Sequence, residues 1–254
     1  MTLDNSKALV ILGVLLALGM SSAAFIFGIQ AKYIGSGKQS IAVKGLAEKP
    51  VTADYAEWSA GLRVKGATFA EALANLRKER PALDAFLVAQ GFAADALKGG
   101  KETVTPNFVD EEVPGGEGRT RSVQRGFNAA QDVLVTSKDL PRIETAHRAI
   151  LQFIGEGHPA NFEDPAFLVS NLEEIKMSLI GAATQNAQAR ALEFAKNGNT
   201  KVGAMRSASQ GAFYILPAGA SVDSSDYGYG GTYDKSTIAK TARVVVTIEY
   251  NIER

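Results

Sequence analysis

The stretch that decides the fold reads Ala56-Glu57-Trp58-Ser59-Ala60-Gly61-Leu62-Arg63-Val64-Lys65. Its even-numbered residues are apolar, and its odd-numbered residues are polar or glycine. Because successive side chains of a strand point to opposite faces, this period of two predicts a strand with one buried face. The C-terminal run repeats the pattern and predicts a long last strand over residues 239–252, with one apolar face made of Ala242, Val244, Val246, Ile248, Tyr250 and Ile252.

A first helix is predicted over residues 69–90. The capping box Thr68-Phe69-Ala70-Glu71 opens it, and Gly91 is placed as its C-terminal stop. Because proline lacks the N–H of the helical ladder, Pro81 predicts a kink or a break inside this helix.

Two further segments have the helical period. One begins near Asp139, accepts Pro141 in its first turn and ends at Gly155. The other spans residues 172–197 and places four alanines on one face, namely Ala183, Ala187, Ala191 and Ala195. Such small side chains predict close packing against a sheet or another helix.

The remaining strand candidates are short apolar or alternating runs at residues 41–43, 102–113, 120–136, 166–169 and 201–215. The turn formers of residues 114–118 join the second and third of these runs as a hairpin. Residues 216–236 are rich in Gly, Ser and Asp and predict a long loop. Hairpins interspersed with helices predict an α+β fold, with a mainly antiparallel sheet packed with three helices, rather than a doubly wound parallel sheet.

An uncharged apolar run occupies residues 8–31, between Lys7 and Lys32. At ~1.5 Å per residue it forms ~36 Å of helix, which is enough to cross a ~30 Å hydrocarbon core. We therefore expect an N-terminal transmembrane helix with residues 1–34 as the anchor, 35–40 as a tether and 41–254 as the α+β domain. The alternative is a signal peptide cleaved after Ser22-Ala23-Ala24. The apolar run continues beyond that site, which favours the anchor.

The anchor carries small residues at spacings that let two helix backbones approach closely, and the candidate packing residues are Gly13, Ala17, Ser21, Ala24 and Gly28. The other interpretation is that glycine and alanine are simply frequent in membrane helices. Orientation is less clear, because Lys7 opposes Lys32, Lys38 and Lys44. Taken literally, the positive-inside rule puts the domain in the cytoplasm, although a large C-terminal domain is translocated largely regardless of these charges.

The composition excludes several functions. The 27 Lys and Arg balance 27 Asp and Glu, and no basic run is present, so we expect no nucleic-acid partner. The chain has no cysteine, which excludes a disulfide, a thiol nucleophile and an iron–sulfur site. Phosphate-binding glycine loops and a Gly-x-Ser-x-Gly elbow are also missing from the sequence. We expect no catalytic residue, no metal and no cofactor.

Both histidines have two interpretations. His147 lies on the apolar stripe of its helix, where we expect a partly buried ring that is hydrogen-bonded at the edge of the core. His158 either lies in a solvated loop or joins Glu156, Glu163 or Asp164 at a metal ion. The run Asp110-Glu111-Glu112 is typical of a solvated strand end.

Three groups of residues carry a resemblance to a known family: Ile41-Ala42-Val43-Lys44-Gly45 with Lys49-Pro50, Gly126-Phe127-Asn128-Ala129 leading into residues 133–140, and Ala195-Lys196-Asn197-Gly198 before Val202-Gly203. Over roughly residues 40–254 the chain resembles the SIMPL-domain family of bacterial envelope proteins, which includes periplasmic and outer-membrane immunogenic antigens and proteins of oxidative-stress defence. It departs from the family pattern at Val51, where an Asp is usual and Asp54 comes later, and at Phe127, where a Tyr is usual. The resemblance implies an exported α+β domain, with ring-like oligomers in some members and no catalytic residue to carry over.

We therefore expect a non-enzymatic envelope protein, anchored once in the bacterial inner membrane, with its C-terminal domain in the periplasm and a link to envelope or oxidative-stress defence. Its expected partners are the lipid bilayer, further copies of itself in a ring-like homo-oligomer and an unidentified envelope protein. A strand over 239–252 left at a sheet edge would favour pairing between copies, and an internal partner is the other solution. The alternative function is a metal-dependent or hydrolytic periplasmic stress enzyme that uses His158 and nearby carboxylates.

Overall fold

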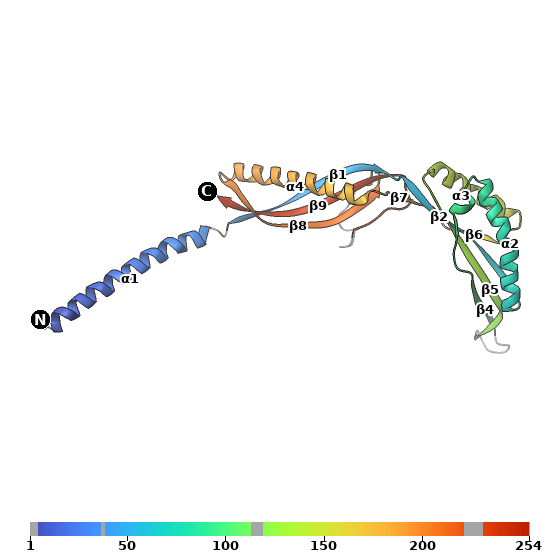
Figure 1. Ribbon diagram of the computed structural model, residues 1–254, viewed down its shortest axis with the longest axis horizontal. Coiled ribbons are helices and arrows are strands. Elements are labelled where there is room, and N and C mark those ends of the chain that lie inside the picture. The colour runs from blue at the N-terminus through green and yellow to red at the C-terminus, as the bar shows by residue number, and fades with distance from the viewer. Residues whose placement is uncertain (1–4, 37–38, 113–118, 221–230, 254) are drawn as a thin grey trace. The chain divides into compact units, whose positions relative to one another are not determined.

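The computed structural model describes residues 5–36, 39–112, 119–220 and 231–253 (Figure 1). The chain divides into two compact units, and each is described by itself. One unit contains Met1–Ala47, Met177–Ala212 and Val244–Arg254, and the other contains Glu48–Lys176 and Phe213–Arg243. The predicted α+β fold is confirmed, with antiparallel sheets and an N-terminal apolar helix.

The N-terminal helix α1 spans Asn5–Ser36 and confirms the helix predicted over residues 8–31. It also includes Gly35 and Ser36, which were expected to begin the tether. One glycine costs a helix about 1 kcal/mol, which does not stop a long apolar helix. Residues 37 and 38 lie outside the described part of the chain, and the first strand begins at Ser40.

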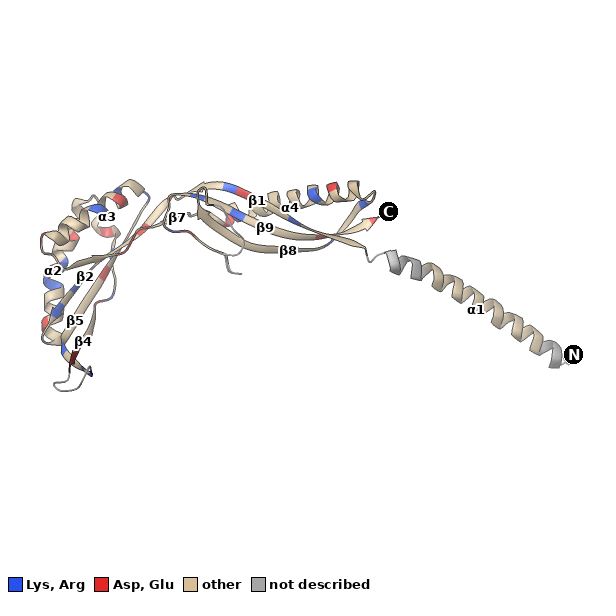
Figure 2. Cartoon of the chain, turned by 180° about the vertical axis from the view of Figure 1, so that it is seen from behind, with Lys and Arg blue, Asp and Glu red and all other residues tan. Residues whose placement is uncertain are grey.

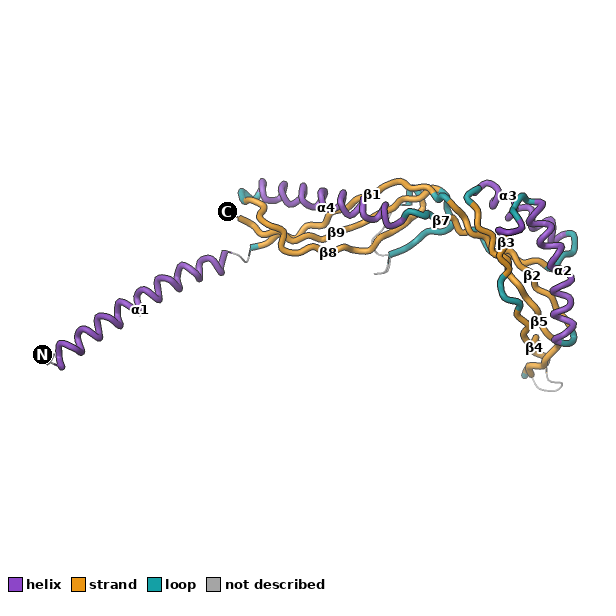
Figure 3. The backbone as a smooth tube through the Cα atoms, in the orientation of Figure 1, coloured by secondary structure: helices purple, strands orange, loops and turns teal. Residues whose placement is uncertain are grey.

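A three-stranded sheet has the order β1-β9-β8, with β1 at Ser40–Thr52, β9 at Ala239–Glu253 and β8 at Lys201–Pro217 (Figure 3). The last strand is therefore paired on both sides. Of the two predicted alternatives for residues 239–252, pairing within the chain is therefore confirmed. This strand is not a free edge that could pair with a second subunit. The structure also extends β1 well beyond the predicted residues 41–43. Pro50 interrupts the alternating pattern there, and an edge strand tolerates proline.

Helix α4 spans Leu172–Asn197, as predicted, and packs closely on β1. A Cβ added at Gly45 of β1 would lie 1.9 Å from the carbonyl oxygen of Ala183 and 2.8 Å from Cβ of Ala187. The strand and helix backbones therefore approach each other at a distance that only glycine permits. The predicted alanine stripe is confirmed, since Ala183, Ala187, Ala191 and Ala195 are all buried.

The second sheet has six strands and is centred on β2. Strand β5 pairs antiparallel with β2 and places Val135 opposite Trp58. Strands β3 and β4 pair with the far side of β5, and β6 and β7 pair with the far side of β2. The bounds are Tyr55–Gly66 for β2, Leu97–Gly99 for β3, Thr103–Glu112 for β4, Thr120–Ser137 for β5, Ala160–Phe162 for β6 and Ala166–Leu168 for β7. The hairpin of β4 and β5 is confirmed, and its loop, residues 114–118, lies outside the described residues.

Helices α2 and α3 cover one face of this sheet and complete a core of large side chains. Helix α2 spans Phe69–Ala89 and α3 spans Leu140–Gly155, and a short turn of 3-10 helix, η1, lies between them in the chain at Ala94–Ala96. The caps are those predicted: Thr68 accepts from the N–H of Glu71, and Asp139 accepts from the N–H of Arg142. The sequence predicted a kink or a break at Pro81: the break is wrong, because α2 continues through it, and the kink stays a prediction. Packing of the helix on both sides of the proline compensates for the lost bond, and its fully buried residues are Ala72, Leu76, Leu83 and Leu87.

Candidate functional site

The apolar surface of α1 is the first candidate site. Leu9–Ile29 is 21 residues long, and none of it is buried. Figure 2 shows no charged residue between the grey ends of this helix. An exposed apolar surface of this extent is unfavourable in water, and its length matches the hydrocarbon core of a bilayer. It therefore fits a membrane anchor, and a signal sequence would have the same composition.

The five candidate packing residues of α1 form one stripe. At about 100° per residue they lie within about 80° of the helix circumference, and they are Gly13, Ala17, Ser21, Ala24 and Gly28. A Cβ added at Gly13 or Gly28 would meet no atom within 4 Å, so a second helix has room to approach. The neighbouring Ser22 hydroxyl donates to the carbonyl of Leu18 at 2.8 Å and needs no other partner. Packing of this stripe against another helix stays a prediction.

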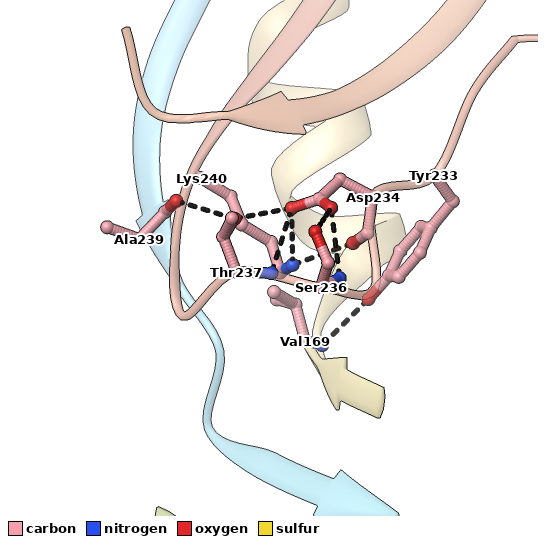
Figure 4. A network of polar contacts seen from close by, with 7 residues as sticks. All are labelled: Val169, Tyr233, Asp234, Ser236, Thr237, Ala239 and Lys240. Carbon is pink, nitrogen blue, oxygen red and sulfur yellow. Dashed lines mark hydrogen bonds and ion pairs between the residues drawn. The ribbon is translucent and has the colours of Figure 1, made fainter. Parts of the chain in front are cut away.

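The second candidate site is a polar network around Lys240, a fully buried ammonium at the start of β9 (Figure 4). Its Nζ donates to the carbonyl oxygen of Asp234 at 2.6 Å and to the carboxylate Oδ2 of the same residue at 3.0 Å. A buried charge is costly unless it is paired and hydrogen-bonded. Asp234 supplies both compensations from a single residue.

The carboxylate of Asp234 accepts several further hydrogen bonds. Ser236 donates its N–H and its hydroxyl to Oδ1 at 2.9 and 2.7 Å, and the Thr237 hydroxyl donates to Oδ2. Burial acts to raise the pKa of Asp234, but the hydrogen bonds from Thr237, Ser236 and Lys240 outweigh it and hold the pKa far below its ordinary value. The carboxylate is therefore ionised at neutral pH and balances the buried ammonium.

This network fastens the end of the predicted 216–236 loop to the second unit. Tyr233 forms an isolated β-bridge with Ile215 of β8. The N–H of Ile215 donates to the carbonyl oxygen of Thr232, and the N–H of Asp234 donates to the carbonyl oxygen of Ile215, both at 2.8 Å. The N–H of Val169 donates to the Tyr233 hydroxyl oxygen at 2.9 Å, and burial raises the pKa of this phenol. Residues 221–230, the middle of the loop, lie outside the described part of the chain. The described end is held in place by these contacts, while Thr232, Lys235 and Ser236 are exposed.

A smaller polar cluster joins Asp54 to Ser170. Asp54 accepts the N–H of Ser170 at 2.9 Å and also its hydroxyl, and the hydroxyl bond is the main cause that lowers the pKa of Asp54. The Ser170 hydroxyl therefore donates its hydrogen bond to the Asp54 carboxylate. The pair connects the corner between β1 and β2 to the start of α4.

His158 contacts a carboxylate other than those proposed for a metal. His158 Nδ1 lies 3.2 Å from Oε2 of Glu79, while Glu156 accepts a hydrogen bond from Gln152. Glu163 contributes its backbone carbonyl to the Trp58 indole. Over the described ranges, no three His, Asp or Glu side chains converge as ligands.

His147 is partly buried, as expected, but the expected hydrogen bond is not formed. Its Nε2 lies 3.5 Å from Oδ1 of Asp164 and makes no hydrogen bond, so the two interact only as charges when the ring is protonated. The ring instead packs edge-on against Trp58 and Phe162, with centroids 6.1 and 5.2 Å away. The aromatic core already fills the space around it, which favours ring packing over a polar contact.

The Lys240 network was not predicted above, although the sequence contains a pattern that indicates it. Lys240 has the same parity as Ala242 and Val244 and so falls on the buried face of β9. A lysine at such a position needs a buried partner. The sequence Asp234-Lys235-Ser236-Thr237 has the pattern in which an Asp side chain accepts from the following residues, and the two observations together point to Asp234.

Fold and surfaces together define a class of protein: an α+β domain behind an apolar N-terminal helix. Residues 41–250 match the family described as SIMPL, a protein of unknown function (DUF541). The match spans most of the chain, and the chain belongs to the SIMPL family. No curated protein matches it. The family and the apolar helix fit a membrane-anchored periplasmic protein.

Proposed function

We propose that this chain is a non-enzymatic protein of the bacterial inner membrane, crossing it once, whose periplasmic domain self-assembles into a ring-like oligomer in envelope or oxidative-stress defence. The observation that carries the proposal is the fully exposed apolar surface of Leu9–Ile29. A retained span removes that surface from water and concentrates the domains on one membrane face. Even weak lateral contacts between domains then gain from a raised effective concentration.

The use of the polar groups supports a non-enzymatic role. Lys240 and Asp234 neutralise each other inside the fold, and Ser170 donates to Asp54. His158 contacts Glu79 rather than the carboxylates next to it in sequence. Elemental analysis of the purified protein tests the metal-enzyme alternative, because a stoichiometric metal that is lost in His158→Ala would favour it.

Retention of the anchor is tested by the intact mass of protein from native membranes. We expect the mass of a chain that retains residues 8–31. A control variant, Ala24→Leu, removes the small residue that a signal peptidase requires, and its mass should differ only by the substitution. A wild-type species that starts near Phe25, together with an uncut variant, would show that α1 is a signal peptide.

Orientation is tested by a reporter fused after Arg254 that is active only in an exported compartment. We expect activity, also in a variant with Lys7→Gln, because the translocation of a large domain does not depend on one flanking charge. An inactive fusion, together with activity of a second reporter at the same position that works only in the cytoplasm, would contradict the proposal and favour the literal lysine count.

Self-assembly is tested by light scattering of the detergent-extracted full chain and of a chain without residues 1–34. Assembly should weaken on truncation but persist at micromolar concentration, because the soluble domain is proposed to hold the oligomer. Circular dichroism checks that the truncated chain is folded. A folded, strictly monomeric truncation would show that the domain does not drive assembly.

A further inference from the structure

Most sheet edges in the described chain are protected against pairing with another chain. Strand β4 carries Pro106, an irregular register between Pro106 and Phe108, and the carboxylates of residues 110–112. Strands β3, β6 and β7 have three residues each. Prolines, bulges, charges and short strands are the usual devices that prevent edge pairing.

The outer edge of β1 is protected by α4. Asn186 accepts the N–H of Leu46 at 3.1 Å, and the Arg190 guanidinium donates to the carbonyl of Lys44 at 3.1 Å. These helix side chains satisfy the main-chain groups that an edge strand leaves open. The β1 edge is thus blocked at Lys44 and Leu46.

The opposite side of the same sheet is open along residues 204–211, here called the β8 edge. All eight residues are exposed, they include no proline, and Arg206 is the sole charge among them. In the parts of the chain that the structure describes, β8 is the last strand of its sheet, and the bridge to Tyr233 lies beyond this segment, at Ile215. A long strand with small side chains and free main-chain groups is a template for another strand.

We propose that the β8 edge pairs with the β8 edge of a second copy of this chain, antiparallel about a two-fold axis through Ala208. The inference rests on the proposed self-assembly and names the surface that begins it. Two three-stranded sheets then become one sheet of six strands, with both α4 helices on the same face, because the axis is perpendicular to the sheet.

A second copy is the occupant that the segment itself fits. Centred on Ala208, the pairing places Ser207 opposite Ser209 of the second copy, and Arg206 opposite Gln210. Opposed hydroxyls form favourable cross-strand pairs, and no like charges lie opposite each other. The remaining pairs bring together alanine, glycine and Met205, so bulky side chains do not hinder the approach.

The same geometry is compatible with two anchors in one membrane. The Ser40 hydroxyl donates to Glu249, and Ser207 donates to the same carboxylate at 3.2 Å. The chain therefore joins the sheet near the level of the proposed axis rather than at a distant end of the strands. A two-fold axis along the membrane normal brings both copies of Ser40 to the same membrane surface.

The experiment uses the full-length chain in detergent and in native membranes, where the absence of cysteine makes a single introduced thiol unique. Ala208→Cys places two thiols across the axis, and a short bis-maleimide should convert it to a covalent dimer. Ala204→Cys is the matched control, because it changes the same residue type, also exposed, on the same strand. Its two thiols would be ~27 Å apart, at ~3.4 Å per residue over eight positions, and should not be joined.

Charge variants at Gln210 give a second readout without cysteine. Gln210→Glu places a carboxylate opposite Arg206 of the second copy, twice per dimer, and should tighten dimerisation several-fold in sedimentation. Gln210→Arg places like charges there and should weaken it several-fold. Within one chain residue 210 is four positions from Arg206, so neither change should alter folding, and thermal unfolding checks this.

The outcomes separate this inference from the proposed function. No cross-linking of Ala208→Cys, equal cross-linking of both thiol variants, or the same affinity for both charge variants overturns the β8 pairing. If the full chain is still oligomeric by light scattering, the proposed self-assembly stands and another surface holds it. If the full chain is monomeric, both the β8 pairing and the proposed self-assembly are wrong.

Discussion

The two sheets of this protein differ in the size of the side chains through which their covering helices approach them. The six-stranded sheet buries large groups from its strands and helices, with Trp58, Leu62, Leu83 and Ile150 fully buried. The three-stranded sheet meets α4 through the alanine stripe and Gly45. A core of large side chains is sensitive to lost volume, whereas a layer of small side chains is sensitive to added volume.

The sheets also differ at their edges. In the six-stranded sheet the described edges are short, irregular or charged. In the three-stranded sheet one edge is contacted by Asn186 and Arg190, and the other has no neighbouring strand along residues 204–211 in the part of the chain that the structure describes. The proposed pairing of two copies therefore uses the three-stranded sheet.

The largest effect is expected where volume is lost from the large-residue core. Trp58→Ala should lower the free energy of unfolding by about 3–5 kcal/mol, because it empties a fully buried site. It also removes the indole N–H that donates to Glu163 at 3.0 Å. Urea unfolding measures the change. The control is Leu151→Ala on the exposed side of α3, which should stay within about 0.5 kcal/mol of wild type.

The next largest change in unfolding free energy is expected at the buried charge of Lys240, which is stabilised by an ion pair rather than by the packing of large or small side chains. Lys240→Met should cost about 3 kcal/mol, because it leaves the Asp234 carboxylate without its buried ammonium. The matched control is Lys235→Met, an exposed lysine of the same segment, with little change expected. An equal cost for both variants in urea unfolding would show that the ion pair contributes nothing specific.

The local patterns in the sequence predicted nearly all long elements. Alternation identified β2 and β9, and the alanine stripe identified α4 with its bounds, because these signals depend only on which face is buried. Strands β3 and β6 were missed, since three residues hold no period and, unlike the equally short β7, neither is a wholly apolar run. The full length of β1 was missed for two reasons. Pro50 argues against a strand but is tolerated at the edge of a sheet, and Gly45 interrupts the apolar alternation because it allows close contact with α4.

The candidate sites depend on contacts that no local pattern contains. The apolar helix α1 was readable from composition alone. The pairing of Lys240 with Asp234 needs the turn that returns residues 234–237 to β9. His158 was expected beside Glu156, but the loop places it against Glu79, a residue distant in sequence. The bare edge of β8 follows from strand order, which the sequence did not determine.

Added volume should destabilise the small-residue layer. Gly45→Ala is expected to cost about 1–3 kcal/mol, because its Cβ would overlap the backbone of α4 at Ala183 and the helix must move. Gly181→Ala, on α4 with no atom within 4 Å of the added Cβ, is the control of opposite sign. It should gain up to about 1 kcal/mol from helix propensity. If Gly45→Ala and Gly181→Ala changed the thermal stability equally, the layer of small side chains would not be specifically sensitive to added volume, and this difference between the two sheets would be wrong.

The smallest effect is the acid dependence of the Asp234 network. The pKa of Asp234 is lower in the folded chain than its ordinary value of about 3.9, so the unfolded chain binds the proton first as the pH falls. Its contribution is therefore complete above about pH 5 and is lost progressively at lower pH, by about 1 kcal/mol between pH 5 and pH 3.

Asp234→Asn isolates this contribution, because an amide does not titrate in this range. The variant should be less stable than wild type at pH 7, and the difference in unfolding free energy should narrow by about 1 kcal/mol between pH 5 and pH 3. Urea unfolding at several pH values, with Asp95→Asn on η1 as the control carboxylate, measures it. A constant difference would mean that the Asp234 carboxylate titrates alike in the folded and unfolded chains, and that the hydrogen bonds of Ser236 and Thr237 do not hold its charge.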